Sequence, residues 1–235
     1  MARVSVDLNE PTPYIEPSGR FYRFRRKLTF AFAFKLINQF STRSRIQSIL
    51  EIGTGSGYFL SSCHDRFPRA KLFGIEYDER LLEESRSRAT NAQCSQGNAE
   101  TFCLLPEKFD VIVSFQVIEH LFNPSEMLNR VREHLNPGGL FIVTSPNLEG
   151  IGAKIMGSNW HGYRDDHVSL KSAKEWVSII EGHGFHTRYA GSTFFSGIPV
   201  MNRAPLGFIN WGLLLLFGSA KWDKGESFVG AFTLK

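Results

Sequence analysis

The stretch from residue 48 to residue 60 constrains the fold of this chain more than any other. It opens with the apolar, β-branched run Ser48-Ile49-Leu50-Glu51-Ile52, which is typical of a buried strand. Glycines then occupy positions 53, 55 and 57, ahead of a segment that can be helical. Glycine lets the backbone turn sharply and approach a ligand without a Cβ, and the helix that follows would direct N–H groups at that ligand. The sequence therefore predicts a strand, a ligand-binding turn and a helix.

The spacing of these glycines separates two classes of nucleotide ligand. The dinucleotide fingerprint G-x-G-x-x-G requires a third glycine at the position of Tyr58. The run Glu51-x-Gly53-x-Gly55-x-Gly57 instead resembles the first motif of class I S-adenosylmethionine-dependent methyltransferases, E/D-x-G-x-G-x-G. Another nucleotide and a plain tight turn are the alternatives at this motif.

Length and composition favour one α/β domain. A chain of 235 residues, 42% hydrophobic and 21% charged, can bury a core of ordinary size. Part of the net charge of +4 comes from a basic cluster at residues 20–27, which we interpret as a solvated helix end. A nucleic-acid binder usually has a broader basic face, so no nucleic-acid partner is expected.

The cysteines Cys63, Cys94 and Cys103 include no C-x-x-C pair. This pattern indicates neither a disulfide framework nor a cysteine zinc site, and each thiol is expected to be a small buried hydrophobe. Lys35 interrupts the apolar run after the basic cluster, so no secretory signal is expected. The chain is predicted to be cytoplasmic.

Residues 1–45 are expected to form an N-terminal arm and a helical cap. Prolines and a glycine punctuate residues 11–19, which favours an extended segment. From 20 to 40, large apolar residues recur at helical spacing, which predicts one amphipathic helix or two short ones. A cap over the site is what the methyltransferase resemblance implies, and core packing explains the same stripe equally well.

Residues 71–76 read as the second strand, which ends in an acid 23 residues after Gly53. In nucleotide-binding α/β folds an acid at this place accepts hydrogen bonds from ribose hydroxyls, so Glu76 is the predicted ribose ligand. Tyr77 follows it and can lie on the adenine face. A solvated acid at a strand end is the alternative.

The loop Gly97-Asn98-Ala99-Glu100 follows a third strand at 93–96 and resembles the family's G-D-A-E loop. The resemblance implies contact between the acid of that loop and the adenine amino group. Asn98 replaces the acid here, and its side-chain carbonyl can still accept a hydrogen bond from the amine.

The most specific resemblance is the run F-D-V-I-V-S-F-Q-V-I-E-H-L at residues 109–121. It looks like the fourth strand and following segment of the group of class I methyltransferases that includes the ubiquinone-pathway O-methyltransferases. The L-x-P-G-G pattern that starts at residue 135, with its proline at 146, is also similar to that group.

Strands and helices alternate from residue 48 to residue 147, which predicts a parallel sheet with helices on both faces. A helix is expected at 171–181 and strands at 185–190 and 227–234, the last of which folds back antiparallel between strands five and six in the family. The expected fold is α/β: a Rossmann-like, doubly wound, seven-stranded, mostly parallel sheet with an antiparallel last strand. Residues 46–235 would form one S-adenosylmethionine-binding domain, with substrate-side insertions at about 146–170 and 195–225.

The resemblance implies S-adenosyl-L-methionine as cofactor and S-adenosyl-L-homocysteine as its product. Its predicted contacts are Glu51, Gly53, Gly55, Gly57, Tyr58, Glu76, Tyr77, Asn98, Ala99 and Gln116.

The predicted reaction is methyl transfer to a small molecule, chiefly at a hydroxyl oxygen. A hydroxyl acceptor needs a base, and histidine titrates in the right range. His120 and His167 are the first candidates and His161 the next, while Trp160, His161 and Tyr163 lie on a loop placed to line a substrate pocket. For each histidine a purely structural role is the alternative.

No metal ion is expected. The ubiquinone-pathway enzymes have E-x-x-E-H at the end of strand four, which the resemblance links to a bound cation. This chain has Gln116-x-x-Glu119-His120, and loss of the first carboxylate leaves a poor site for a hard cation.

Residues 204–220 form an uncharged window that includes Pro205, Gly207, Asn210 and Gly212. Its length is at the lower limit for a membrane span, and these four residues are poor choices for one continuous helix. We expect a hydrophobic lid or a peripheral membrane contact, with core packing as the alternative. Other functions left open are N- or C-methylation, a non-catalytic donor-binding partner subunit and a dinucleotide-dependent oxidoreductase.

Overall fold

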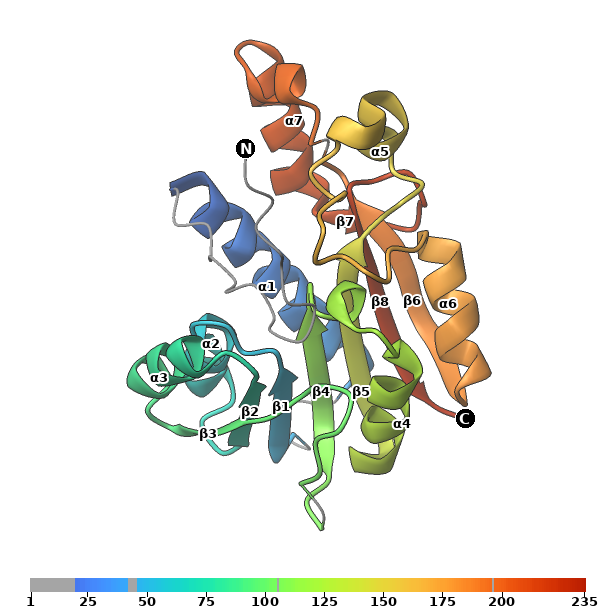
Figure 1. Cartoon of the computed structure of the whole chain (residues 1–235). Coiled ribbons are helices and arrows are strands. Elements are labelled where there is room, and N and C mark those ends of the chain that lie inside the picture. Colours follow the sequence, from blue (N-terminus) through green and yellow to red (C-terminus); the bar gives the residue numbers. More distant parts are fainter. Residues whose placement is uncertain (1–19, 42–45, 105, 196) are drawn as a thin grey trace, which may run out of the picture.

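The computed structural model describes residues 20–41, 46–104, 106–195 and 197–235; the predicted arm at 1–19 lies outside these ranges. Eight strands form one sheet in the order β3-β2-β1-β4-β5-β8-β6-β7 (Figure 1). The strands are β1 Ser48–Ile52, β2 Lys71–Glu76, β3 Ala92–Gln96, β4 Phe109–Phe115, β5 Leu135–Pro146, β6 Phe185–Thr193, β7 Ser219–Ala220 and β8 Ser227–Leu234.

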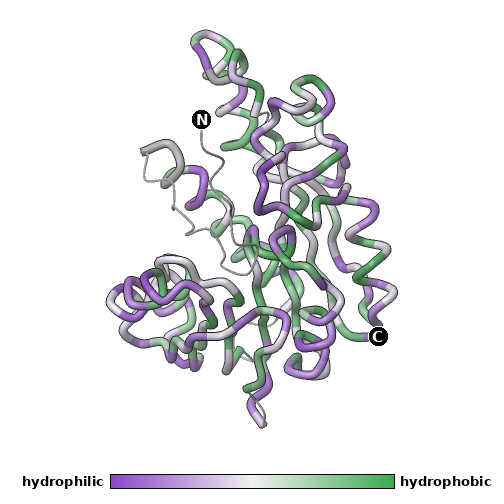
Figure 2. The backbone as a smooth tube through the Cα atoms, in the orientation of Figure 1, coloured by the Kyte–Doolittle hydropathy of each residue, from purple (hydrophilic) through white to green (hydrophobic). Residues whose placement is uncertain are grey.

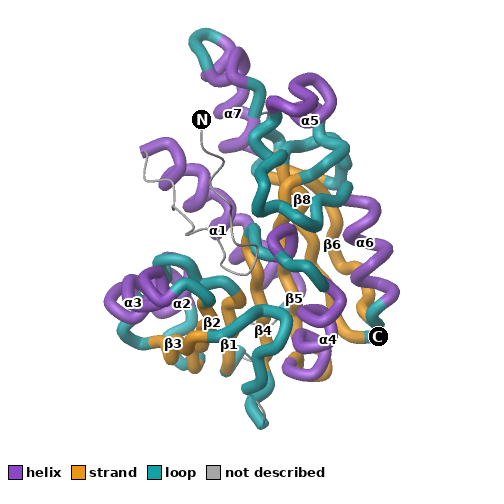
Figure 3. The backbone as a smooth tube through the Cα atoms, viewed as in Figure 1, coloured by secondary structure: helices purple, strands orange, loops and turns teal. Residues whose placement is uncertain are grey.

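The helices are α1 Arg20–Phe40, α2 Tyr58–Arg66, α3 Glu79–Arg88, α4 Pro124–His134, α5 Ile151–Met156, α6 Ala173–Gly182 and α7 Leu206–Phe217, with short 3-10 turns η2 Ile118–His120, η3 Gly157–Asn159 and η4 Pro199–Asn202. In Figure 3, α4 and α6 lie along the sheet, whereas α7 stands above it. The α/β fold predicted from the sequence is confirmed.

The sheet is doubly wound about β1, which pairs in parallel with β2 on one side and β4 on the other. β8 lies antiparallel between β5 and β6, as expected from the resemblance. The prediction of seven strands was wrong by one. β7 adds two residues antiparallel to the end of β6, and a two-residue strand is too short to leave a hydrophobic pattern.

Each face of the sheet carries its own buried core, because successive strand side chains point to opposite faces. Ile49 and Val113 face one core, to which α1, α2 and α3 contribute. Leu50 and Ile112 face the other, which α4 and α6 cover. Cys63 and Cys94 are buried as predicted, but Cys103 is exposed, because it lies in the loop before β4 and outside either core.

The predicted helix at 20–40 forms as one element, α1. Its C-terminal half is part of the core: the ring of Phe34 stacks on that of Phe59 in α2, with centroids 5.1 Å apart, and Ile37 is fully buried. Leu36, a member of the predicted stripe, is also buried in this half of the helix.

Residues 206–217 of the window at 204–220 form one continuous helix, α7, against the expectation from its glycines and Asn210. Gly207, Asn210 and Leu214 are its buried residues, and their spacing puts them on one face. The small and polar residues thus lie at the contact face, while Phe208 and Leu216 are 77% and 79% exposed. α7 stands at the top of the view in Figure 2. Within the described ranges, none of the helices has the length and hydropathy needed to cross a membrane.

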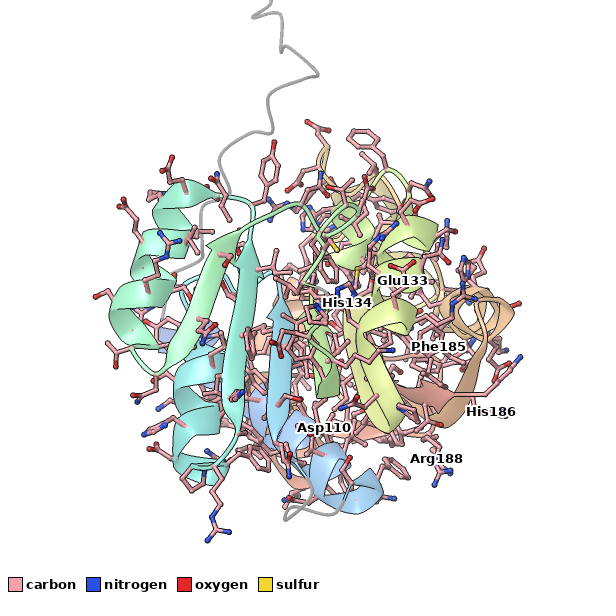
Figure 4. All side chains as sticks on the ribbon, turned by 90° about the horizontal axis from the view of Figure 1, so that it is seen from below. Asp110, Glu133, His134, Phe185, His186 and Arg188 are labelled. Atoms are coloured by element: carbon pink, nitrogen blue, oxygen red, sulfur yellow. The ribbon has the colours of Figure 1, made fainter. Side chains whose placement is uncertain are left out.

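The amino-terminal edge of the sheet is held by polar side chains, seen from below in Figure 4. Asp110 accepts hydrogen bonds from the backbone N–H groups of Gln47 and Ser48, at 2.7 and 3.1 Å, and from the Asn136 side chain at 2.8 Å. His134 accepts from the Leu104 N–H at 2.9 Å. These bonds join the starts of β1, β4 and β5 at the edge opposite the site.

We expect Asp110→Ala to lower the free energy of unfolding by about 1–3 kcal/mol, because three donors lose their acceptor. Asp110→Asn keeps one acceptor oxygen and should cost less. Urea denaturation measures both. Asp65→Ala, at an exposed position on α2, is the matched control and should change stability by less than about 0.5 kcal/mol. Equal losses at Asp110 and Asp65 would contradict the role of this edge.

Candidate active site

One cavity of about 1490 Å³ lies at the carboxyl ends of the parallel strands, where ligands bind in open α/β sheets. We call the part that includes Gly55, Glu76 and Asn98 the glycine end, and the part that includes Glu119, His120, His161 and His167 the histidine end. α1 covers both parts through Arg25, Arg26 and Thr29.

All of the site residues predicted from the sequence line this cavity except Gly57. A Cβ at Gly57 would meet Ser85 of α3 at 2.7 Å, so this glycine permits close packing of α2 on α3. Gly53 has φ +75°, and a Cβ there would meet Val117 at 2.3 Å. Gly55 has φ +50° and open space where its Cβ would be, so it is the glycine that keeps the cavity open.

Glu76 ties the end of β2 to the glycine turn. Its Oε2 accepts from the Gly55 N–H at 2.7 Å, and its Oε1 accepts from the N–H groups of Tyr77 and Asp78 at 2.9 and 3.1 Å. A carboxylate has about four acceptor positions, so most are already used. Burial raises the pKa of Glu76, and the three backbone donors act against that rise.

Glu51 is buried beneath the glycine turn, with 2% of its surface exposed. Burial, followed by the charge of Glu76, holds its pKa well above the ordinary value. Its Oε2 has no hydrogen-bond partner among the described residues. The glycine end therefore contains a buried acid whose charge is poorly compensated, which favours a cationic ligand there.

The remaining residues of the glycine end differ in how open they are. Tyr77 is 53% exposed. The Asn98 side-chain oxygen accepts from the Glu100 N–H at 2.8 Å, which leaves it one further lone pair. Gln116 has φ +56°, an unusual value outside glycine, and its side chain donates to Thr144 Oγ1 at 3.2 Å.

Tyr58 lies between two guanidinium groups. Those of Arg26 and Arg88 lie 3.5 and 3.8 Å from the centre of its ring, at cation–π distances. The predicted role of Tyr58 at the cofactor is thus combined with a clamp that joins α1, α2 and α3.

His120 and His167 meet at the histidine end, with ring centroids 4.6 Å apart and planes nearly perpendicular. Nδ1 of His120 lies 3.1 Å from the Asp166 carbonyl oxygen and 3.4 Å from its carboxylate. Nδ1 of His167 lies 2.8 Å from the Gly162 carbonyl oxygen. Burial lowers the pKa of both imidazoles, which favours their neutral forms.

Glu119 is a candidate functional residue to which the sequence assigned no role. It is fully buried on η2. Burial raises its pKa to about 8, and a hydrogen bond from the Ser145 side chain acts against that rise. One donor atom each from Glu119, His120 and His167 lie within 4.8 Å of one another. The expectation that no metal binds was based on Gln116, whereas the third residue of this group is His167.

Glu226 is a second residue that sequence reasoning missed. It is 1% exposed and accepts from Trp160 Nε1 and, at 2.9 Å, from the Gly197 N–H. His161 Nε2 lies 3.3 Å from its Oε1. No sequence signal marks Glu226, because its partners are 29 to 66 residues away. Trp160 is only 1% exposed, so it mainly anchors this loop.

Comparisons with known proteins agree with this geometry. A family model described as a methyltransferase domain matches residues 20–189. A probable S-adenosylmethionine-dependent methyltransferase of Mycolicibacterium smegmatis is 35% identical over 101 residues, which cover 43% of this chain and 38% of that protein. A ubiquinone biosynthesis O-methyltransferase of Cereibacter sphaeroides is 30% identical over 118 residues, covering 48% and 47%. The chain thus spans less than half the length of these curated relatives.

A solved plantazolicin methyltransferase, in complex with a triazolic desmethylPZN analog and SAH, has a TM-score of 0.68 at 16% identity and covers 92% of this chain and 88% of that one. At this identity the likeness concerns the fold alone. The family match over most of the chain, the doubly wound sheet and the glycine turn lead to one conclusion: the chain belongs to the methyltransferase-domain family of S-adenosylmethionine-dependent methyltransferases.

Proposed function

We propose that this protein transfers the methyl group of S-adenosylmethionine to a hydroxyl oxygen of a small molecule that has an apolar part. One observation carries the proposal: the glycine turn and His161 line the same cavity, and His161 Nε2 lies 3.3 Å from the buried carboxylate of Glu226. The donor would occupy the glycine end, and the acceptor the histidine end.

Charge supports the donor assignment. The sulfonium of S-adenosylmethionine is positive, and the buried acids Glu51 and Glu76 lie under the glycine end. A cation there offsets part of the cost of keeping a carboxylate out of water. Glu76 can accept a ribose hydroxyl at its remaining position, Asn98 can accept from the adenine amino group, and Tyr77 can lie against the base.

We expect Gly55→Arg to abolish binding of S-adenosylhomocysteine while the circular dichroism spectrum stays unchanged. The new side chain would fill the glycine end, since an added Cβ at Gly55 meets open space. Isothermal titration measures the affinity. Gly182→Arg is the matched control, because its Cβ also meets no atom within 4 Å and it lies at the end of α6, away from the cavity. Unchanged affinity in Gly55→Arg would mean that the donor site is misassigned, and NAD binding in its place would favour an oxidoreductase.

The base is the next element of the proposal. Nε2 of His161 lies 3.3 Å from Oε1 of Glu226. Because a carboxylate only accepts hydrogen bonds, we place the proton of neutral His161 on Nε2 and its lone pair on Nδ1. The acceptor oxygen would attack the methyl carbon as its proton passes to Nδ1, and the C–S bond would break to leave a neutral thioether. His120 and His167, the first candidates from the sequence, have their Nδ1 atoms directed at backbone carbonyls; His161 is the one held by a fully buried carboxylate.

We expect His161→Asn to lower kcat/KM by about 10²–10⁴ with little change in S-adenosylhomocysteine affinity. Transfer of labelled methyl from S-adenosylmethionine into a cell extract, and then to the purified acceptor, measures the rate. His183→Asn is the control, since His183 bonds the Ile179 carbonyl of α6 at 2.7 Å, away from the cavity. Full activity of His161→Asn would exclude His161 as the base and would favour His120 or His167 in that role.

The pH profile gives a second test of His161. Burial lowers its pKa, the charge of Glu226 acts against that effect, and Arg25 and His167 add to the lowering. We expect kcat/KM to rise with pH through a pKa below about 6.5 and to remain high above it. Glu226→Gln should move the rise to still lower pH and reduce the plateau. If Glu226→Gln did not change the pH at which kcat/KM rises, the interaction of Glu226 with His161 would be contradicted.

The apolar helix α7 supports an acceptor presented at, or drawn from, an apolar phase. Its exposed residues include Phe208, Ile209, Leu215 and Leu216. Its buried residue Leu214 and the following Gly218 line the cavity. Arg203 and Lys221, near its two ends, are exposed cations, which suits a helix lying in a membrane interface.

We expect the protein to float with vesicles of phosphatidylcholine and phosphatidylglycerol. The double variant Phe208→Ser, Leu216→Ser should not float, because it loses the apolar area that α7 would bury in the membrane. Phe122→Ser, at an 81% exposed aromatic outside α7, is the control. Label recovered in the lipid fraction of the extract would agree with this contact. No flotation, together with label in the aqueous fraction, would make α7 an ordinary lid over a soluble acceptor.

A further inference from the structure

We propose that Arg25 binds an anionic group of the acceptor, a carboxylate or a phosphate, in the part of the cavity that contains His161. This assignment rests on the proposed function, which places the acceptor at the histidine end. Arg25 is partly buried in the first half of α1. It lines the cavity together with His161, Phe195 and Ser227.

Two elements on the far side of the cavity hold the guanidinium group of Arg25. Its Nη2 donates to Ser227 Oγ at 3.2 Å, and Ser227 directly follows Glu226, the carboxylate that faces His161. Its central carbon lies 5.4 Å from the centre of the Phe195 ring, at a cation–π distance. A side chain that is already held in place loses little freedom when a ligand binds to it.

The next arginine of α1 faces the other end of the cavity. The guanidinium of Arg26 lies 3.5 Å from the centre of the Tyr58 ring, directly after the glycine turn. Successive residues of an α-helix point about 100° apart, so α1 directs one cation to each end. We therefore assign Arg25 to the acceptor and not to the carboxylate of the donor.

The chemistry of the guanidinium indicates the class of ligand. It is charged at every working pH, and its N–H donors form a planar fork. This fork binds a carboxylate or a phosphate through two parallel hydrogen bonds, which are stronger than bonds between neutral groups. The same cavity contains such a pair within the protein, since Arg164 donates to both carboxylate oxygens of Asp166 at 2.9 Å.

The charge of Arg25 also acts on the proposed base. Burial lowers the pKa of His161, the charge of Glu226 acts against that effect, and the charges of Arg25 and His167 add to it. During methyl transfer the base takes up a proton, and a cation near it disfavours the imidazolium. An anion bound to Arg25 would offset this cation, so an anionic acceptor would meet a stronger base than the free enzyme contains.

The test measures anion binding to the full chain saturated with S-adenosylhomocysteine. Isothermal titration gives the affinities for benzoate, phenyl phosphate and the neutral compound benzamide. We expect at least one of the two anions to bind at least about tenfold more tightly than benzamide. The anion that binds more tightly indicates whether the acceptor carries a carboxylate or a phosphate.

Arg25→Gln should abolish this preference, and Arg25→Lys, which keeps the charge but not the fork, should retain part of it. Arg188→Gln is the matched control: the Arg188 guanidinium also lies over a phenyl ring, 5.5 Å from the centre of Phe40, and Arg188 is exposed on β6 outside the cavity lining. Its preference for anions should equal that of the unaltered protein. Unchanged circular dichroism and S-adenosylhomocysteine affinity would show that each variant is folded.

Equal affinities for the anions and for benzamide, or a preference that Arg25→Gln leaves intact, would overturn the proposal. Loss of S-adenosylhomocysteine affinity in Arg25→Gln with an unchanged circular dichroism spectrum would also overturn it, because Arg25 would then serve the donor. Anion binding through Arg25 in a protein that transfers no methyl group would keep the anion site and reject the proposed function. Methyl transfer to a neutral acceptor would do the reverse.

Discussion

The pairing of β1 with β2 on one side and β4 on the other is the constraint on which the site depends. The connection after β1 leads to β2 on one side, and the connection after β3 leads to β4 on the other side. The carboxyl end of β1 therefore opens into a crevice, which a tight turn closes. The N–H groups of Gly53 and Thr54 both donate to the Ile75 carbonyl, at 2.8 and 3.1 Å, which bends the chain over the end of β2. Val117, after β4, packs against Gly53 so closely that no Cβ would fit. The cavity begins at this junction.

Buried carboxyl groups surround the cavity, and each is compensated differently. Glu76 has three backbone donors, and Glu226 has an indole, an imidazole and a backbone N–H. Glu51 and Glu119 each keep at least one oxygen without a partner in the described ranges. Uncompensated burial of an acid is expensive, and Glu51 lies at the glycine end, where we propose the positively charged sulfonium of the donor.

Much of the fold followed from local pattern. The last strand was expected at 227–234 and forms at Ser227–Leu234, and the glycine turn precedes α2 as its spacing required. These features depend on alternation, glycine positions and chain order, which a single sequence contains. β7 and the helix α7 were not foreseen, because one is too short to show a pattern and the other has its small residues on the contact face. At the site, nearly all the residues expected at the donor line one cavity, since they follow successive parallel strands.

The sequence by itself determined the doubly wound sheet, the glycine turn at the carboxyl end of β1 and the edge of the sheet at which a ligand binds, because periodicity and chain order specify these. Only the tertiary structure decided which side chains are partners across the cavity. Glu226 meets His161 from 65 positions along the chain, and His167 completes a cluster with Glu119 and His120. Such contacts depend on how loops of different strands pack together, and the burial that shifts the pKa values of these groups exists only after that packing. Local sequence patterns do not carry this information.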